Sequence, residues 1–174
     1  MMKYALYDYI PQRRLRRTTF EQQDINRLIL DFKDGRNYAS RWAARAMSRT
    51  LSAMDLSDVV VVCIPASSSY STCRRYKTFS SMLCQMCNAV NGYDYVSVAG
   101  TRSKLHLSKN RQQRNDQLEN VCIDAEFFKG KNVLLIDDIC TTCKSANRFA
   151  DMMQQAGATV VMQLFLAKTK SYYC

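Results

Sequence analysis

The chain has 174 residues, of which 47% are hydrophobic, and its 25 basic and 15 acidic side chains give a formal net charge of +10. This length supports one domain with a core large enough to fold without disulfides or metals, and the composition excludes a disordered chain. No apolar run approaches the roughly 18 residues of a membrane-spanning helix. The first residues lack the apolar core of a secretory signal, so we expect a cytoplasmic protein.

The positive charge favours phosphate-rich partners, either nucleic acid or small phosphates, with ordinary solubility as the alternative. The densest basic run precedes the first predicted helix and comprises Arg13, Arg14, Arg16 and Arg17. We interpret residues 1–18 as a basic N-terminal arm and residues 19–174 as one domain.

Eight cysteines without a secretion signal do not indicate a disulfide scaffold. Cys63 lies in an apolar run and is predicted to be a small core residue. Two Cys-x-x-Cys pairs, Cys84 with Cys87 and Cys140 with Cys143, raise the alternative of a four-cysteine zinc site. The long separation between the pairs argues against it, because compact zinc ribbons have shorter spacers.

Two helices are predicted near the N-terminus. Thr18, with Glu21 three residues later, forms a capping-box pattern that opens the first, and Asp34 with Gly35 ends it. The second covers about residues 37–51, and we expect the two helices to cover one end of the core. Their expected buried positions recur at helical spacing and are Phe20, Ile25, Leu28, Ile29 and Phe32, then Trp42, Ala43, Ala46, Met47 and Leu51.

The remainder alternates between strand and helix patterns. Residues 59–64 form a continuous apolar, β-branched run, which is typical of a strand buried on both faces. Further strands are predicted at residues 93–99, 132–136 and 159–167, and further helices at about residues 73–91 and 144–156. This order predicts βαβ units and an α/β fold built on a parallel sheet. Because such sheets bind ligands beyond the carboxyl ends of their strands, the loops after residues 64 and 136 are the expected site.

The loop after residue 136 combines two chemistries. Thr141, Thr142, Lys144 and Ser145 lie where the loop becomes a helix, and there backbone N–H groups, the helix dipole and hydroxyls favour phosphate. Asp137 and Asp138 precede them and could bind sugar hydroxyls or a metal carried by the ligand. A ribose 5-phosphate meets both demands. The alternative is a solvated strand end followed by threonines that cap the helix.

Cys140 and Cys143 admit a different interpretation, a redox pair at a strand–helix junction. A redox role leaves the two acids and the threonines unused, and an activated cysteine at the helix N-terminus would compete with phosphate. The sequence therefore favours the phosphate interpretation.

The run VLLIDDICTTCKS resembles the phosphoribosyl pyrophosphate motif of the type I phosphoribosyltransferases, and residues 25–168 resemble the ComF-type, competence-associated branch of that superfamily. The resemblance implies a phosphoribosyltransferase fold, with helices on both faces of a parallel sheet and a small N-terminal helical hood. It also implies a glycosyltransferase reaction in which an acceptor displaces pyrophosphate from the anomeric carbon. Mg²⁺ is the expected cofactor and is bound through the ligand, with no direct protein ligands.

The resemblance assigns roles residue by residue. Asp137 and Asp138 bind the ribose hydroxyls as the catalytic acids, and the 5-phosphate loop is Thr141, Thr142, Cys143, Lys144 and Ser145. The pyrophosphate loop is Ala66, Ser67 and Ser68, joined by Arg75 and, as an alternative to a solvated helix face, by Arg74. Residues 100–120 are polar and basic and match a flexible loop whose candidate residues are Lys104, His106, Lys109 and Arg111.

Cys143 departs from the motif, which has glycine at this position, where the backbone approaches phosphate and adopts positive φ. This substitution bears more on turnover than on binding. The alternative function is a non-catalytic phosphoribosyltransferase-like protein that binds nucleic acid in DNA uptake or regulation. Candidate partners are thus phosphoribosyl pyrophosphate, nucleic acid and a second copy of the chain in a homodimer, and no segment specifies the acceptor.

Overall fold

The computed structural model describes residues 1–15, 18–98, 118 and 120–170. In chain order its elements are β1 (Met2–Tyr9), α1 (Gln12–Leu15), α2 (Phe20–Lys33), α3 (Asn37–Leu51), β2 (Val59–Cys63), α4 (Ser69–Cys87), β3 (Val90–Asn91), the 3₁₀ helix η1 (Tyr93–Tyr95), β4 (Val96–Val98), β5 (Val121–Ile123), α5 (Ala125–Phe128), β6 (Asn132–Cys140), α6 (Lys144–Gln155) and β7 (Thr159–Thr169). Within these residues no helix is both long enough and apolar enough to cross a membrane.

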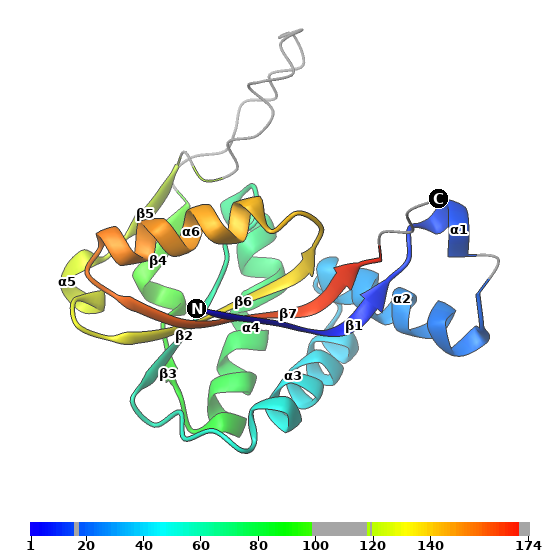
Figure 1. The fold of residues 1–174 in the computed structure, drawn as a ribbon, viewed down its shortest axis with the longest axis horizontal. Coiled ribbons are helices and arrows are strands. Elements are labelled where there is room, and N and C mark those ends of the chain that lie inside the picture. The colour runs from blue at the N-terminus through cyan, green and yellow to red at the C-terminus, as the bar shows by residue number, and fades with distance from the viewer. Residues whose placement is uncertain (16–17, 99–117, 119, 171–174) are drawn as a thin grey trace, which may run out of the picture.

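Five of the strands form one sheet in the order β1-β7-β6-β2-β3, and every neighbouring pair is parallel. Figure 1 shows this sheet nearly edge-on, with α6 on one side and α3 and α4 on the other. The predicted α/β fold, a parallel sheet with helices on both faces, is therefore confirmed.

Each face of the sheet has its own apolar core. On one face, residues of α2, α3 and α4, among them Phe32, Met47 and Phe79, pack on alternate side chains of β2, β6 and β7. On the other face, Phe128 and Phe149 pack on Val60, Val62 and the opposite alternation of the same strands. The two N-terminal helices thus lie in one layer with α4 and share its core.

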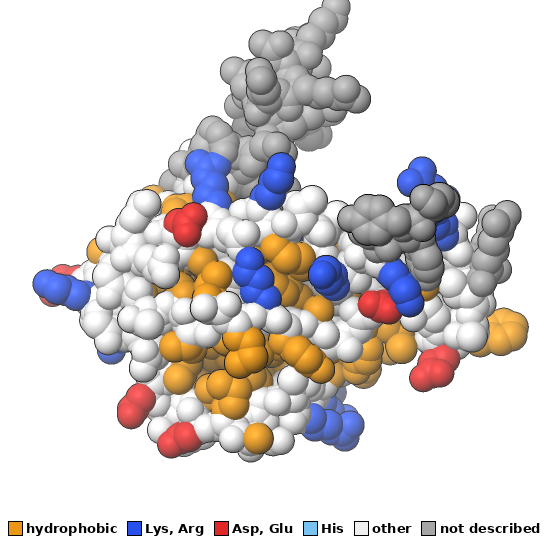
Figure 2. Space-filling model, in the orientation of Figure 1, with side chains coloured by type: hydrophobic (Ala, Val, Ile, Leu, Met, Phe, Trp, Pro, Cys, Tyr) orange, Lys and Arg blue, Asp and Glu red, His pale blue; other side chains and the backbone are white. Residues whose placement is uncertain are grey.

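The sheet includes a segment that the sequence interpretation assigned to the N-terminal arm. Met2–Tyr9 is strand β1, which pairs in parallel with β7 from Met2 opposite Met162 to Tyr9 opposite Thr169. It is an edge strand, and large apolar side chains remain exposed on it: Met2 is 58% exposed and Tyr4 49%. In Figure 2 hydrophobic side chains gather around this edge of the sheet.

The strand predicted at residues 93–99 is present as the shorter β4, Val96–Val98, but its expected place in the parallel sheet is wrong. The parallel strand on this side is the short β3. After it the chain turns away from the sheet, and at this turn the Asn91 side chain accepts a hydrogen bond from the Tyr93 backbone N–H (3.0 Å). A 3₁₀ turn follows, and β4 then pairs antiparallel with β5 in a separate two-stranded sheet.

The start of α2 differs by one residue from the predicted capping box. Thr19 is the N-cap and accepts a hydrogen bond from the Gln22 N–H, whereas the Thr18 hydroxyl donates to the Leu15 carbonyl. Phe20, predicted to be buried, is 87% exposed, while Phe32 is fully buried as expected. The buried positions of α3 include Ala43, Met47 and Leu51, as predicted, and Trp42 is half-buried.

The corner between α2 and α3 is fitted closely against α4. Gly35 has φ +71°, and a Cβ built on it would lie 2.5 Å from the Arg74 carbonyl oxygen. A side chain at this position would therefore separate the corner from the start of α4. Gly130 has nearly the same φ, +74°, but no atom lies within 4 Å of the corresponding position.

These two glycines form a matched pair for a stability measurement. Gly130→Ala should cost about 1–2 kcal/mol, the penalty of a left-handed backbone for a residue with a Cβ. Gly35→Ala should cost about 1–3 kcal/mol more, because it adds a clash with backbone atoms. Urea unfolding curves of both variants measure the difference, and equal losses would contradict close packing at the corner.

Candidate active site

The site lies where two neighbouring strands send their helices to opposite faces of the sheet. β2 and β6 are paired in parallel from Val59 opposite Asn132 to Cys63 opposite Ile136. The helix after β2 is α4, whose core lies on one face, and the helix after β6 is α6, whose core lies on the other. A crevice forms at such a switch point beyond the carboxyl ends of the strands.

A cavity of about 410 Å³ occupies this crevice. It brings together two loops that are about 70 residues apart in the chain, as the sequence predicted. From the loop after β2 and from α4 it is lined by Ile64, Pro65, Ala66, Ser67, Ser71 and Arg75, and from β6, its loop and α6 by Asp137, Asp138, Ile139, Cys140, Thr141, Thr142, Cys143, Lys144, Ser145 and Ala146. Lys33 and Phe165 complete the lining.

The loop after β2 is partly fixed by its own hydrogen bonds. Ser68 is the N-cap of α4 and accepts from the Ser71 N–H at 3.1 Å, so its hydroxyl is engaged in the helix start. The Ala66 N–H donates to the Thr72 hydroxyl at 3.0 Å. Ala66 and the exposed Ser67 line the cavity, whereas Ser68 does not.

Asp138 is buried and ion-paired. Its Oδ2 lies 2.6 Å from Nη1 of Arg75, and only 8% and 11% of the two side chains are exposed. Arg75 also donates from Nε to the Lys33 carbonyl at the end of α2, at 2.9 Å. The guanidinium therefore joins α2, α4 and β6 at the cavity wall.

Asp137 lies in a different environment from its neighbour. Its Oδ1 accepts hydrogen bonds from the Tyr76 hydroxyl at 3.0 Å and from the Asp138 N–H at 2.8 Å. Removal of the carboxyl from water, reinforced by repulsion from the Asp138 carboxylate, raises the pKa of Asp137 from its ordinary 3.8 to about 8. At neutral pH the Asp137 carboxyl therefore favours its protonated form.

The start of α6 is open to an anion. None of the described side chains caps it, so N–H groups of its first turn have no side-chain acceptor within the described part of the chain. Thr141 and Thr142 are exposed before it, and the Thr141 hydroxyl lies 2.9 Å from that of Thr169 on β7. Unpaired helix N–H groups together with hydroxyls on a cavity wall are chemically suited to phosphate.

Cys143 has a left-handed backbone, with φ 53° and ψ 14°. Positive φ was expected at this position from the glycine of the resembled motif. Cys143 also forms a disulfide with Cys140, with 5.1 Å between the two Cα atoms. The sequence analysis placed Cys143 in the 5-phosphate loop and favoured phosphate binding over a redox pair; the structure links the two cysteines around Thr141 and Thr142.

The remaining candidates lie elsewhere. Arg74 does not line the cavity: its guanidinium is 3.8 Å from Asp34 and lies over the Tyr70 ring. The predicted flexible-loop residues, Lys104, His106, Lys109 and Arg111, lie outside the described residues. In the part of the chain that is described, no group of three His, Cys, Asp or Glu side chains could bind a metal.

Two residues of the site, Tyr76 and Lys33, were not predicted from the sequence. Tyr76 follows Arg75 directly and is fully buried, with its hydroxyl on Asp137. Its place in the buried row of α4, which includes Thr72, Tyr76, Phe79, Ser80 and Leu83, was the available signal. Lys33 reaches the site only because the α2–α3 corner docks on α4, and no local pattern indicates that contact.

Comparison with known proteins adds little to this geometry. No protein-family model matches the chain, and no curated protein matches it. Among solved structures, the fold is similar to that of a purine phosphoribosyltransferase from Pyrococcus horikoshii Ot3, with a TM-score of 0.37 and 13% sequence identity over 76% of this chain and 84% of that chain. A likeness at this level carries no function over to this chain.

The disulfide can be tested on a single peptide. Trypsin cleavage after Lys131 and Lys144 releases residues 132–144, which contain Cys140 and Cys143 and no other cysteine. From protein digested without reductant, this peptide should resist alkylation and be lighter by a pair of hydrogen atoms than the reduced form. Mass spectrometry would contradict the pairing if the peptide were alkylated at both cysteines without reduction.

The raised pKa of Asp137 predicts a pH-dependent stability. Between pH 4 and 8 the folded protein binds a proton that the unfolded chain has released, so this carboxyl lowers stability as pH rises through that window. Asp137→Asn keeps an oxygen for Tyr76 and for the Asp138 N–H but cannot ionise.

The variant should therefore match the wild type near pH 4 and exceed it by about 1 kcal/mol or more near pH 8, in urea unfolding. Asp58→Asn, an exposed carboxyl before β2, is the control and should show no such trend. A constant difference between Asp137→Asn and wild type across the range would contradict the raised pKa.

Proposed function

We propose that this chain is a phosphoribosyltransferase-like protein that binds phosphoribosyl pyrophosphate with Mg²⁺. The expected reaction displaces pyrophosphate from the anomeric carbon by an acceptor. The observation that carries the proposal is the cavity at the β2–β6 switch point, where an acid pair, an uncapped helix start and a small-residue loop face one another.

The phosphate end of the ligand is assigned to the start of α6. The N–H groups of its first turn, with the Thr141 and Thr142 hydroxyls and the Lys144 ammonium nearby, complement a dianionic 5-phosphate. The left-handed Cys143 directs the chain from the strand into this helix start.

The ribose is assigned to the acid pair. A ribose diol offers two hydroxyl donors, and Asp137 and Asp138 offer carboxyl acceptors on the same cavity wall. Arg75 fixes Asp138, and Tyr76 fixes Asp137, so both carboxyls are oriented before a ligand arrives. Such preorganisation reduces the cost of ordering the site on binding.

The pyrophosphate is assigned to the loop after β2, on the opposite wall from the 5-phosphate. Ser67 is exposed there, and Arg75 remains a predicted contact although its described partners are Asp138 and the Lys33 carbonyl. Because the acids are few and oriented by protein groups, Mg²⁺ fits this site as a ligand-bound ion. When bound, it would neutralise the negative charge that develops on the leaving pyrophosphate.

In the proposed reaction the bonds that break and form belong to the ligand and the acceptor. The bond from the anomeric carbon to the pyrophosphate oxygen breaks, a bond to the acceptor nucleophile forms, and pyrophosphate leaves with the electron pair. Positive charge develops on the ribose ring beside Asp137 and Asp138, and an ionised carboxylate at Asp137 favours it electrostatically once the pH approaches its raised pKa of about 8. The acceptor is not specified by any described residue.

Asp137→Asn tests this proposal through pH as well as affinity. If the ligand prefers the ionised carboxyl, wild-type affinity for phosphoribosyl pyrophosphate with Mg²⁺ should rise as pH increases from 7 toward and past about 8. A charge-assisted hydrogen bond contributes roughly 1.5–3 kcal/mol, so the variant should bind about ten- to a hundredfold more weakly above that pH. Its affinity should also lack the Asp137-dependent rise.

Calorimetric titration with and without Mg²⁺ measures both effects. Asp137→Asn is preferred to Asp138→Asn, because removing the Asp138 charge leaves Arg75 buried without its partner and destabilises the protein. Asp58→Asn serves again as the exposed control. Wild-type affinity and pH profile in Asp137→Asn, or no binding by the unmodified protein with Mg²⁺, would refute the proposal.

A further inference from the structure

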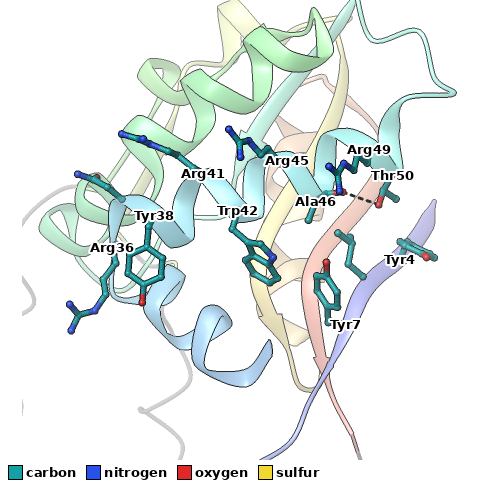
Figure 3. Close-up of a pocket in the computed structure, with 13 residues that line it drawn as sticks. Tyr4, Tyr7, Arg36, Tyr38, Arg41, Trp42, Arg45, Ala46, Arg49 and Thr50 are labelled. Carbon is teal, nitrogen blue, oxygen red and sulfur yellow. Dashed lines mark hydrogen bonds between the residues drawn. The ribbon is translucent and has the colours of Figure 1, made fainter. Parts of the chain in front are cut away.

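A second and larger hollow lies on the opposite side of the α2–α3 corner, between α3 and the edge strand β1. This α3–β1 groove has a volume of about 1140 Å³ and is lined by Tyr4, Leu6, Tyr7, Gly35, Arg36, Asn37, Tyr38, Arg41, Trp42, Arg45, Ala46, Arg49 and Thr50. Figure 3 shows its side chains in two rows along α3, arginines in one and Tyr38 with Trp42 in the other, with Tyr7 facing Trp42 from β1.

The arginine row is regular. Arg41, Arg45 and Arg49 follow one another at four-residue spacing and are all exposed. A rise of 1.5 Å per residue places successive guanidinium attachment points about 6 Å apart along the helix. That spacing is similar to the separation of neighbouring phosphates in an extended single strand of nucleic acid.

These charges are not neutralised by the protein. Among the described residues none of Arg41, Arg45 and Arg49 forms an ion pair, and no Asp or Glu belongs to the groove lining. Like charges at this spacing destabilise a helix slightly instead of stabilising it. The repetition of positive charge along the helix is therefore not explained by the stability of α3.

The second row provides aromatic rings. Tyr38 and Tyr4 are 54% and 49% exposed, and the half-buried Trp42 stacks on Tyr7 with 5.2 Å between ring centroids. Ala46 continues this row with a methyl group, which leaves room in the groove beside Trp42. Exposed rings beside a line of positive charge are the arrangement that binds unstacked bases and their phosphates together.

We propose that the α3–β1 groove binds single-stranded nucleic acid, with phosphates along the row Arg41, Arg45 and Arg49 and bases against Tyr38, Trp42 and Tyr4. The rings favour a single strand over a duplex, because paired bases cannot present their faces to an aromatic side chain. The absence of acidic side chains from the lining favours a polyanion over a polypeptide of mixed charge. This site is separate from the cavity at the β2–β6 switch point and does not depend on what that cavity binds.

The chain carries its own reporter for this test, because Trp42 is its only tryptophan. Titration with an oligothymidine or an oligouridine of roughly 12 nucleotides should quench the tryptophan fluorescence as bases approach the ring. The same titrations, followed by the anisotropy of labelled oligonucleotides over a range of salt, give the affinity and its salt slope. The DNA and RNA arms show which backbone the groove prefers.

The variant replaces Arg41, Arg45 and Arg49 by glutamine together. Its affinity near 0.1 M salt should fall about ten- to a hundredfold, and the slope of log affinity against log salt should decrease by about 2, at roughly 0.7 per lost phosphate contact. The matched control removes the same charge away from the groove, by glutamine at Arg13, Lys77 and Lys129, which do not line it. The control should keep most of the affinity.

Urea unfolding should show that the arginine variant is at least as stable as the wild type, so that loss of binding cannot be attributed to misfolding. Equal loss in the variant and the control would overturn the proposal, as would unchanged binding in the variant or no wild-type binding near 0.1 M salt. Polyglutamate that quenches Trp42 and binds as tightly as the oligonucleotides would also overturn it, in favour of a protein partner.

Discussion

Two adjacent carboxyl groups at the end of a buried strand are the constraint around which this end of the molecule is organised. A carboxylate removed from water needs a charged or hydrogen-bonded partner, or it takes up a proton. Asp138 meets this requirement through Arg75, and Asp137 through Tyr76 and a raised pKa. Consecutive residues of α4 supply both partners, so the position of that helix on the sheet is tied to the acids of β6.

The same constraint reaches the N-terminal helices. Arg75 has a hydrogen bond to the Lys33 carbonyl, the last residue of α2, and Gly35 lets the following corner approach the Arg74 backbone. α3 then runs alongside α4 and shares its core. The corner separates the two hollows of the molecule: Lys33 lines the smaller cavity, and Gly35 with Arg36 lines the α3–β1 groove.

Local hydrophobic patterns in the sequence predicted the strands and helices whose apolar residues are fully buried. The runs of residues 59–64 and 132–136 are apolar on both faces, and α6 has an amphipathic stripe, so each of these elements begins at its predicted residue, although β6 continues past its predicted end to Cys140. β1 was missed because an edge strand is only partly buried, and its alternation of Tyr4, Leu6 and Asp8 is weak. The antiparallel pairing of β4 depends on β5, more than 20 residues later, and the Cys140–Cys143 pairing depends on a backbone turn. No local sequence pattern indicates either pairing.

The distribution of charge over the surface helps to decide whether the positive charge serves solubility or a partner. A net charge of +10 is compatible with solubility alone, but a surface made for solubility mixes its signs, as on α2, where Arg27 lies 3.0 Å from Asp24. α3 differs, because Arg41, Arg45 and Arg49 face a groove without acids and beside aromatic rings. These three arginines thus lie where a polyanion could bind, and this arrangement favours a phosphate-rich partner over simple solubility.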